Sequence, residues 1–127
     1  MNRKRFNLRD RARSFKYAGR GVARLIGKEH NAWIHCAAAV CVVVAGFFFR
    51  LSGLEWVAIV LCIGAVFAAE GFNSAIEALC DRVTPEYDEA IKQSKDLAAG
   101  AVLILAVMSV IVGLTIFVPK IILLFGK

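Results

Sequence analysis

The sequence predicts an all-α membrane protein, built from an N-terminal amphipathic surface helix and three transmembrane helices. Hydrophobic residues make up 59% of the 127 residues, well above the apolar share of an ordinary soluble domain, and the mean hydropathy is +0.66. Basic residues gather at the amino terminus, where the first 28 residues hold ten of the sixteen Lys and Arg beside one acid. We expect a single domain over residues 1–127, with 1–30 as a basic segment at the membrane surface.

The surface helix is predicted from apolar spacing that follows a polar, basic stretch over residues 1–13. From Ser14 onward, apolar residues recur at helical spacing with basic residues between them, as in helices that lie on anionic lipid. The apolar positions are Phe15, Ala18, Val22, Leu25 and Ile26. A nucleic-acid-binding tail is a weaker alternative, because no zinc finger, recognition helix or stacking platform accompanies the charges. A cleaved secretory signal does not fit an apolar run as long as the one that follows.

The first two spans follow from the lengths of their apolar runs. The first covers about residues 32–50 and ends at the turn RLSGLE. The second begins near Trp56 and would be too short to cross the bilayer if it ended before its first charge. It therefore carries Glu70 inside the membrane and runs over about 55–80.

The third span follows a polar loop predicted over 81–96, where Pro85 indicates a turn. It covers about 97–118 and is expected to end at Pro119. The amino terminus and this loop together hold thirteen Lys and Arg, against three on the other side of the membrane. The excess predicts a multi-pass protein with a cytoplasmic amino terminus.

Four cysteines lie within apolar stretches, with no CxxC pair and no histidine cluster. We expect small, buried, reduced thiols. They are Cys36, Cys41, Cys62 and Cys80.

A polar stripe lies on one face of the second span. Its members fall within roughly 100° of one another on a helix: Glu70, Asn73, Ser74, Glu77 and Asp81. Ionisable groups inside a span are costly, and their presence usually indicates function. Contact between helices is the alternative, but it would ordinarily use uncharged amides or hydroxyls.

The acids of the stripe suggest two separate roles, metal binding and proton acceptance. Mg²⁺ commonly takes one or two carboxylates together with substrate phosphates, and Glu29, just before the first span, matches Glu77 in depth. Glu70 lies about two turns deeper, where a lipid hydroxyl can reach it. Desolvation there would make it a stronger general base.

Lys95 and Asp96 begin the third span beside the stripe, and a lysine there can neutralise a phosphate. This combination suits phosphoryl transfer, which needs mainly positioning and charge stabilisation. Pairing of the two residues with each other is an open alternative. GVARLIGKE at 21–29 is not a P-loop, because five residues instead of four lie between its glycines and Glu replaces Ser or Thr. Protein-kinase signatures are also absent.

Two longer motifs resemble a known family. EGFNSAIEALCDR at 70–82 and EYDEAIKQSKDLAAGAV at 86–102 are similar to the bacterial diacylglycerol kinase and undecaprenol kinase family, and the likeness extends over about 14–122. The resemblance implies a homotrimer in the bacterial inner (cytoplasmic) membrane. Its composite active sites would transfer the γ-phosphate of MgATP to a lipid alcohol.

The resemblance also assigns roles by position. It implies Glu70 as the catalytic base, and Glu29 and Glu77 as metal-binding carboxylates. The expected ATP-binding positions are Tyr17, Glu29, Glu77, Glu86, Tyr87, Asp88, Lys95 and Asp96, with Arg13 or another basic residue as a further contact. Asp88 departs from a histidine found in some relatives. Supporting or substrate positions are Asn31, His35, Asn73, Ser74 and Asp81.

The lipid is expected to be undecaprenol, because EHNAWIH at 29–35, EW at 55–56 and IFVPK at 116–120 look more like that branch. Diacylglycerol is the alternative. His35 and Trp56 could shape a lipid pocket, although anchoring at the interface is the preferred interpretation for both. A non-catalytic cation-handling subunit and a membrane adaptor that acts through its basic tail are the rivals from other classes.

Overall fold

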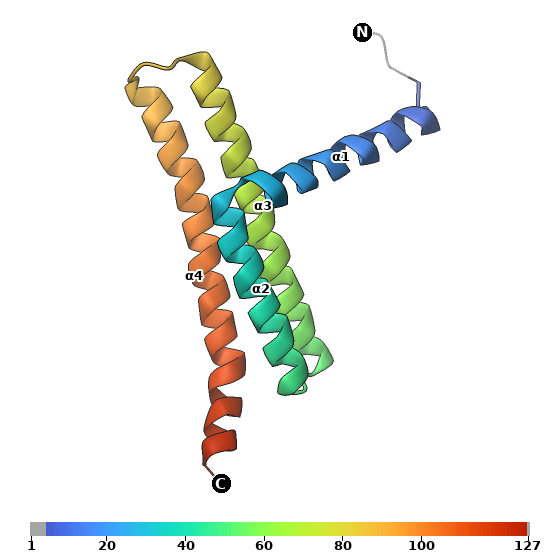
Figure 1. Cartoon of the computed structure of the whole chain (residues 1–127), viewed down its shortest axis with the longest axis vertical. Coiled ribbons are helices and arrows are strands. Elements are labelled where there is room, and N and C mark those ends of the chain that lie inside the picture. The colour runs from blue at the N-terminus through green and yellow to red at the C-terminus, as the bar shows by residue number, and fades with distance from the viewer. Residues whose placement is uncertain (1–4, 127) are drawn as a thin grey trace.

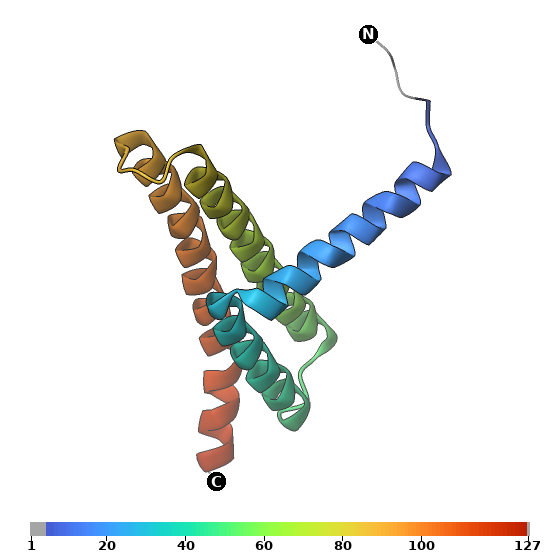
Figure 2. The same ribbon diagram turned by 45° about the horizontal axis from the view of Figure 1, so that its top comes forward.

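The fold consists of four α-helices in a computed structural model of the chain, which describes residues 5–126. They are α1 (Leu8–Lys28), α2 (His30–Phe48), α3 (Gly53–Val83) and α4 (Glu89–Phe125). The described part of the chain contains no strand, so the predicted all-α class is confirmed. In Figure 1, α2, α3 and α4 form an elongated bundle, and α1 points away from it to one side. Figure 2 shows the same separation from a second direction.

The surface helix is longer than predicted. α1 begins at Leu8, and Asn7 caps it by accepting a hydrogen bond from the backbone N–H of Arg9, 3.0 Å away. An N-cap asparagine followed by Asp10 in the first turn is a helix start signal. The predicted start at Ser14 was therefore late, because Leu8 and Ala12 are the only apolar residues between positions 8 and 14.

The three remaining helices are each long and apolar enough to cross a membrane. The 19 residues of α2 span about 28 Å, which matches a hydrocarbon core of about 30 Å. The 31 residues of α3 and the 37 of α4 span about 46 and 55 Å. Both helices extend beyond the junction of α1 and α2 (Figure 1). We call that end of the bundle the α1 side and the opposite end the far side.

The predicted loop over 81–96 is wrong in extent. α3 continues to Val83 and α4 begins at Glu89, so only residues 84–88 connect them. Asp88 caps α4 by accepting a hydrogen bond from the backbone N–H of Ile91 at 3.0 Å. The polar residues around this turn occupy exposed helix faces beyond the membrane, which hydropathy alone cannot distinguish from a loop.

The helix itself does not end at Pro119, where the third span is predicted to end, because α4 continues to Phe125. Proline removes one backbone donor, and transmembrane helices tolerate this loss better than soluble ones do. Beyond the proline, the Lys120 ammonium lies 3.2 Å from the Glu55 carboxylate, which ties this part of α4 to the start of α3.

The far-side turn between α2 and α3 is tightly built. Ser52 and Glu55 form a reciprocal capping box at the start of α3. Gly46 leaves room for the Trp56 ring, since a Cβ at position 46 would lie 2.6 Å from it. Arg50 has a positive φ of 53°, in the left-handed region that favours glycine. Trp56 is thus half-buried against Gly46, and its expected anchoring role stays a prediction.

Few side chains are buried within one chain. Apolar residues all along the bundle are exposed, as Leu54 at 84% and Phe125 at 81% illustrate. Lipid or neighbouring chains must therefore cover them in a membrane. All four cysteines are free; Cys62 and Cys80 are buried as predicted, but Cys41 is exposed.

Candidate active site

Glu70 lies on α3 and is the only buried charged residue in the described part of the chain, at 2% exposure. Its carboxylate oxygen Oε2 lies 3.6 Å from Nε2 of His35 on α2. The next residue, Gly71, faces Leu25 of α1, whose Cδ2 would lie 3.7 Å from a Cβ at position 71. The acid therefore lies close to the place where α1, α2 and α3 meet.

His35 connects this acid to the apolar interior. Its ring meets the Phe67 ring edge to face, with centroids 6.3 Å apart, and its side chain is 23% exposed. The sequence favoured an interfacial anchoring role for His35. In the structure His35 lies about one and a half turns inside α2 and next to Glu70, so its role as a supporting or substrate residue stays a prediction.

The rest of the stripe becomes more exposed toward the α1 side. Asn73 and Ser74 are half-buried, and Glu77 and Asp81 are exposed. Glu77 lies about 10 Å farther along the helix than Glu70. The single face predicted from the sequence thus runs from a dry end at Glu70 to a wet end at Asp81.

The predicted metal carboxylates lie at similar heights. Glu29 precedes His35 by six residues, or about 9 Å of helix, and Glu77 is about 10 Å from Glu70. Glu29 is half-buried and is the N-cap residue of α2, yet its carboxylate makes no capping hydrogen bond there. Within residues 5–126, no group of three or more His, Cys, Asp or Glu side chains is placed to hold a metal ion. One chain therefore offers carboxylates for a metal without completing a ligand set.

The two residues at the start of the predicted third span do not pair with each other. The Lys95 ammonium lies 2.5 Å from the Asp81 carboxylate on α3. Asp96 instead pairs with Lys92, one turn earlier, at 2.8 Å. The alternative that Lys95 and Asp96 form one ion pair is wrong, and Lys95 is held beside the wet end of the stripe.

The connection between α3 and α4 holds three predicted ATP positions, all of them exposed. The Glu86 backbone N–H donates to the Thr84 hydroxyl at 3.2 Å, and Asp88 is the N-cap of α4. The Tyr87 hydroxyl donates to the Glu89 carboxylate. This hydrogen bond raises the pKa of the Tyr87 phenol, and negative charge at Asp96 adds to the effect. The phenol therefore stays protonated at neutral pH.

The predicted site residues nearest the amino terminus lie apart from this connection in sequence. Tyr17 and Arg13 are exposed on α1, and the Arg20 guanidinium lies 5.9 Å from the centre of the Tyr17 ring. Asn31 is exposed in the first turn of α2. Within residues 5–126, no side-chain hydrogen bond or ion pair joins these residues to Lys95 or Glu77, so their place in a nucleotide site stays a prediction.

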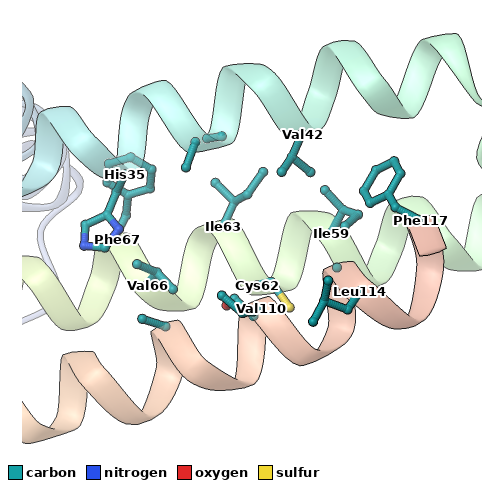
Figure 3. A pocket seen from close by; sticks show the side chains of 15 residues that line it. His35, Val42, Ile59, Cys62, Ile63, Val66, Phe67, Val110, Leu114 and Phe117 are labelled. Atoms are coloured by element: carbon teal, nitrogen blue, oxygen red, sulfur yellow. The ribbon is translucent and has the colours of Figure 1, made fainter. Parts of the chain in front are cut away.

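An apolar groove begins at His35, and sequence reasoning missed it. It lies between α2, α3 and α4, has a volume of about 510 Å³ and extends to Phe117 (Figure 3). Its walls come from three helices whose individual apolar faces all look alike in sequence. Small residues at Ala39, Ala106 and Gly113 were the available signal.

The chain thus places a buried carboxylate near an apolar groove, among helices long and apolar enough to cross a membrane. Comparison with known proteins shows the family. The family model described as prokaryotic diacylglycerol kinase matches residues 16–117. The chain belongs to this family and is a lipid kinase of a bacterial membrane.

Individual relatives carry two different names. An undecaprenol kinase of Bacillus subtilis is 45% identical over 108 residues, which cover 85% of this chain and 88% of the relative. A diacylglycerol kinase of Synechocystis is 36% identical, covering 84% of this chain and 61% of the relative. A diacylglycerol kinase of Escherichia coli is 33% identical, covering 63% and 71%.

Proposed function

We propose that the protein transfers the γ-phosphate of MgATP to the hydroxyl of undecaprenol. The observation that carries the proposal is Glu70, a carboxylate buried at 2% exposure inside a span and next to an apolar groove. Such a group is positioned to take a proton from a hydroxyl that arrives from the lipid. The 45% identity to a relative named undecaprenol kinase favours that alcohol. Diacylglycerol is the second candidate, because the relatives at 36% and 33% carry that name.

The chemistry divides between the two ends of the stripe. The lipid hydroxyl oxygen forms a bond to the γ-phosphorus, the bond to the bridging oxygen breaks and ADP leaves. Glu70 accepts the hydroxyl proton. Lys95 lies at the other end and would neutralise phosphate charge. The exposed residues Tyr17, Glu86, Tyr87, Asp88 and Asp96 would contact the nucleotide.

Glu29 and Glu77 fit Mg²⁺ by their donor chemistry, since that ion prefers oxygen ligands and commonly takes only one or two carboxylates. When bound, the ion would neutralise charge on the transferring phosphate. The absence of a three-residue cluster in the described part of the chain is compatible with ATP phosphates, water or a second chain as the remaining ligands.

A homotrimer is proposed on the same grounds. Three spans leave most apolar side chains and the wet end of the stripe uncovered, so neighbouring copies would enclose the site. The excess of basic residues near α1 and the α3–α4 turn supports placing the α1 side in the cytoplasm, with the protein in the inner membrane. Within each copy, residues 1–127 would form one domain.

The test is a substrate comparison. Purified protein in mixed micelles receives labelled ATP with undecaprenol or with diacylglycerol, with and without a chelator of divalent cations. The proposal predicts Mg²⁺-dependent transfer to undecaprenol, with slower or no transfer to diacylglycerol. Transfer to neither lipid would overturn it, and faster transfer to diacylglycerol would favour the second candidate.

A further inference from the structure

A single residue, Glu29, separates α1 from α2. Its backbone is extended, with φ of −94° and ψ of 114°, and it is both the C-cap of α1 and the N-cap of α2. At this residue the chain turns from α1 into the bundle (Figures 1 and 2). Glu29 is also one of the two carboxylates proposed to bind Mg²⁺. Its backbone torsion angles therefore set both the angle between two helices and the direction of a proposed metal ligand.

Trp33 forms a hydrogen bond on each side of this bend. Its indole Nε1–H donates to the Ile26 carbonyl oxygen in the last turn of α1 at 2.7 Å, and its backbone N–H donates to the Glu29 carbonyl oxygen at 3.3 Å. A carbonyl in the last turn of a helix lacks the backbone N–H donor that a continuous helix would supply. The indole supplies that donor from the next helix, so it ties the end of α1 to the start of α2.

A second contact orients the indole. The His30 ring meets the Trp33 ring edge to face, with centroids 4.7 Å apart and the ring planes at 90°. Trp33 is otherwise 49% exposed, so surrounding side chains of the same chain do not fix its rotamer. The hydrogen bond to Ile26 and the His30 ring together define one orientation of the indole, and with it one angle between α1 and α2.

Membrane anchoring explains only part of this arrangement. Tryptophans are common at membrane interfaces, where the amphipathic ring lies at the level of the headgroups. An exposed ring at Trp33 fits that role, but an indole N–H that only anchors would be directed at water or lipid headgroups. Here the N–H is directed at the backbone of α1. The contact therefore acts on the bend at Glu29.

We propose that Trp33 is a positioning residue for the metal site, whose indole hydrogen bond fixes the bend at Glu29 and holds the Glu29 carboxylate in the direction that Mg²⁺ binding requires. The proposal rests on the proposed function, in which Glu29 and Glu77 bind the ion. Mg²⁺ demands near-ideal octahedral geometry, and the two carboxylates come from different helices, so a change in the bend would separate them. Trp33 itself contacts neither metal nor nucleotide.

A substitution that removes only the donor tests the proposal. Trp33→Phe keeps an aromatic ring beside His30 and loses the N–H. The probe is Mn²⁺ with a non-hydrolysable ATP analogue, and its binding is measured by electron paramagnetic resonance. Trp33→Phe should weaken Mn²⁺ binding by about tenfold, as substitutions of residues that orient metal ligands typically do. Wild-type affinity in this variant would overturn the proposal.

The other tryptophan provides the matched control. Trp56→Phe makes the same change at the far side of the bundle, where the ring packs against Gly46. It should keep the wild-type affinity for Mn²⁺ even where it lowers the melting temperature. Equal losses of Mn²⁺ affinity in Trp33→Phe and Trp56→Phe would assign the effect to general stability and overturn the proposal.

A double-mutant cycle separates the positioning of Glu29 from other effects of the bend. If Trp33 acts through Glu29, Trp33→Phe should cause no further loss of Mn²⁺ affinity in a chain that already carries Glu29→Gln. The Mg²⁺ concentration for half-maximal phosphate transfer should follow the same pattern, with KM for undecaprenol close to wild type. A further loss in the double variant would show that Trp33 acts through another group, which would also overturn the proposal.

A measurement with Trp33 intact covers the case in which Trp33→Phe fails to fold. Trp33 and Trp56 are the only tryptophans in the chain, so Trp56→Phe leaves Trp33 as the only indole. Trp33 follows Glu29 by about one helical turn, and a paramagnetic ion quenches fluorescence at short range. Mn²⁺ with the ATP analogue should therefore quench the Trp33 emission, whereas Mg²⁺ should not. Absence of quenching would separate the metal from the bend and overturn the proposal.

Failure of this proposal can be distinguished from failure of the proposed function. If the wild type phosphorylates undecaprenol with a requirement for Mg²⁺ but fails these tests, only the role of Trp33 is wrong. If the wild type phosphorylates no lipid, the proposed function fails as well.

Discussion

The two ends of the stripe on α3 are built differently. Glu70 is buried within its own chain and lies 3.6 Å from His35, whereas Glu77 is exposed and belongs to no cluster of metal ligands within residues 5–126. Burying a carboxylate in a span is costly, and Glu70 has the His35 imidazole of α2 as its polar neighbour. The wet end needs no such enclosure, because water, nucleotide and a neighbouring chain can supply its partners. A single chain thus builds the Glu70 end of the stripe, which would meet the lipid. It leaves the Glu77 end, which would bind phosphate, exposed.

The largest effect is expected at the enclosed end. Glu70→Gln keeps the shape of the side chain but removes the proton acceptor, and should lower kcat by about a thousandfold. Labelled-phosphate transfer to undecaprenol would measure it. Glu55→Gln is the matched control, since Glu55 lies on the same helix at the far side, next to Lys120. Near-full activity of Glu70→Gln would show that another group accepts the proton.

At the open end, the expected effect is smaller and depends on the metal. Glu77→Gln should lower activity at limiting Mg²⁺ on the order of a hundredfold, and added Mg²⁺ should restore part of it, because substrate phosphates also hold the ion. A Mg²⁺ titration of initial rates would measure the shift. An unchanged Mg²⁺ requirement would remove Glu77 from the metal site and leave the assignment of Glu70 intact.

Substitutions at the far side of the bundle should change the stability of the fold and leave phosphoryl transfer unchanged. Gly46→Ala would place a Cβ 2.6 Å from the Trp56 ring, and should destabilise the fold by about 1–3 kcal/mol through overpacking. Gly53→Ala is the control, since a Cβ at Gly53 meets nothing within 4 Å. Thermal unfolding in detergent would compare them. Equal melting temperatures would show that the turn yields to accommodate the extra carbon.

The smallest effect is expected at Arg50. Its φ of 53° suits glycine, so Arg50→Gly should relieve strain and raise stability by up to about 1 kcal/mol. A small rise in melting temperature with unchanged kinetics is the expected result. A loss of stability would indicate that the arginine side chain makes contacts in the membrane that outweigh the strain.

Sequence reasoning predicted the parts of this structure that depend on hydropathy and helical period. The number of spans, the need to carry Glu70 within one, and the polar face of α3 all follow from those two properties. It missed the helical extensions beyond the membrane, because Asp81, Lys95 and Asp96 look like loop residues when they lie on exposed helix faces. It also ended α4 too early at Pro119.

The relation between His35 and Glu70 could not be predicted, because it depends on how α2 and α3 are rotated against each other. The apolar groove was missed for the same reason. The partners of Lys95 and Asp96 could not be assigned from the sequence either, since adjacent residues point to different sides of a helix. Tertiary packing decided each of these features, and one sequence contains little direct signal for it.

The most direct test of the division between the two ends is the thermal shift caused by MgATP in two variants. A ligand that binds the folded state raises its melting temperature by mass action. Glu70→Gln should keep the wild-type shift although it transfers little phosphate, whereas Glu77→Gln should lose most of the shift. Loss of the shift in Glu70→Gln, or a full shift in Glu77→Gln, would contradict the assignment of chemistry to the enclosed end and nucleotide binding to the open one.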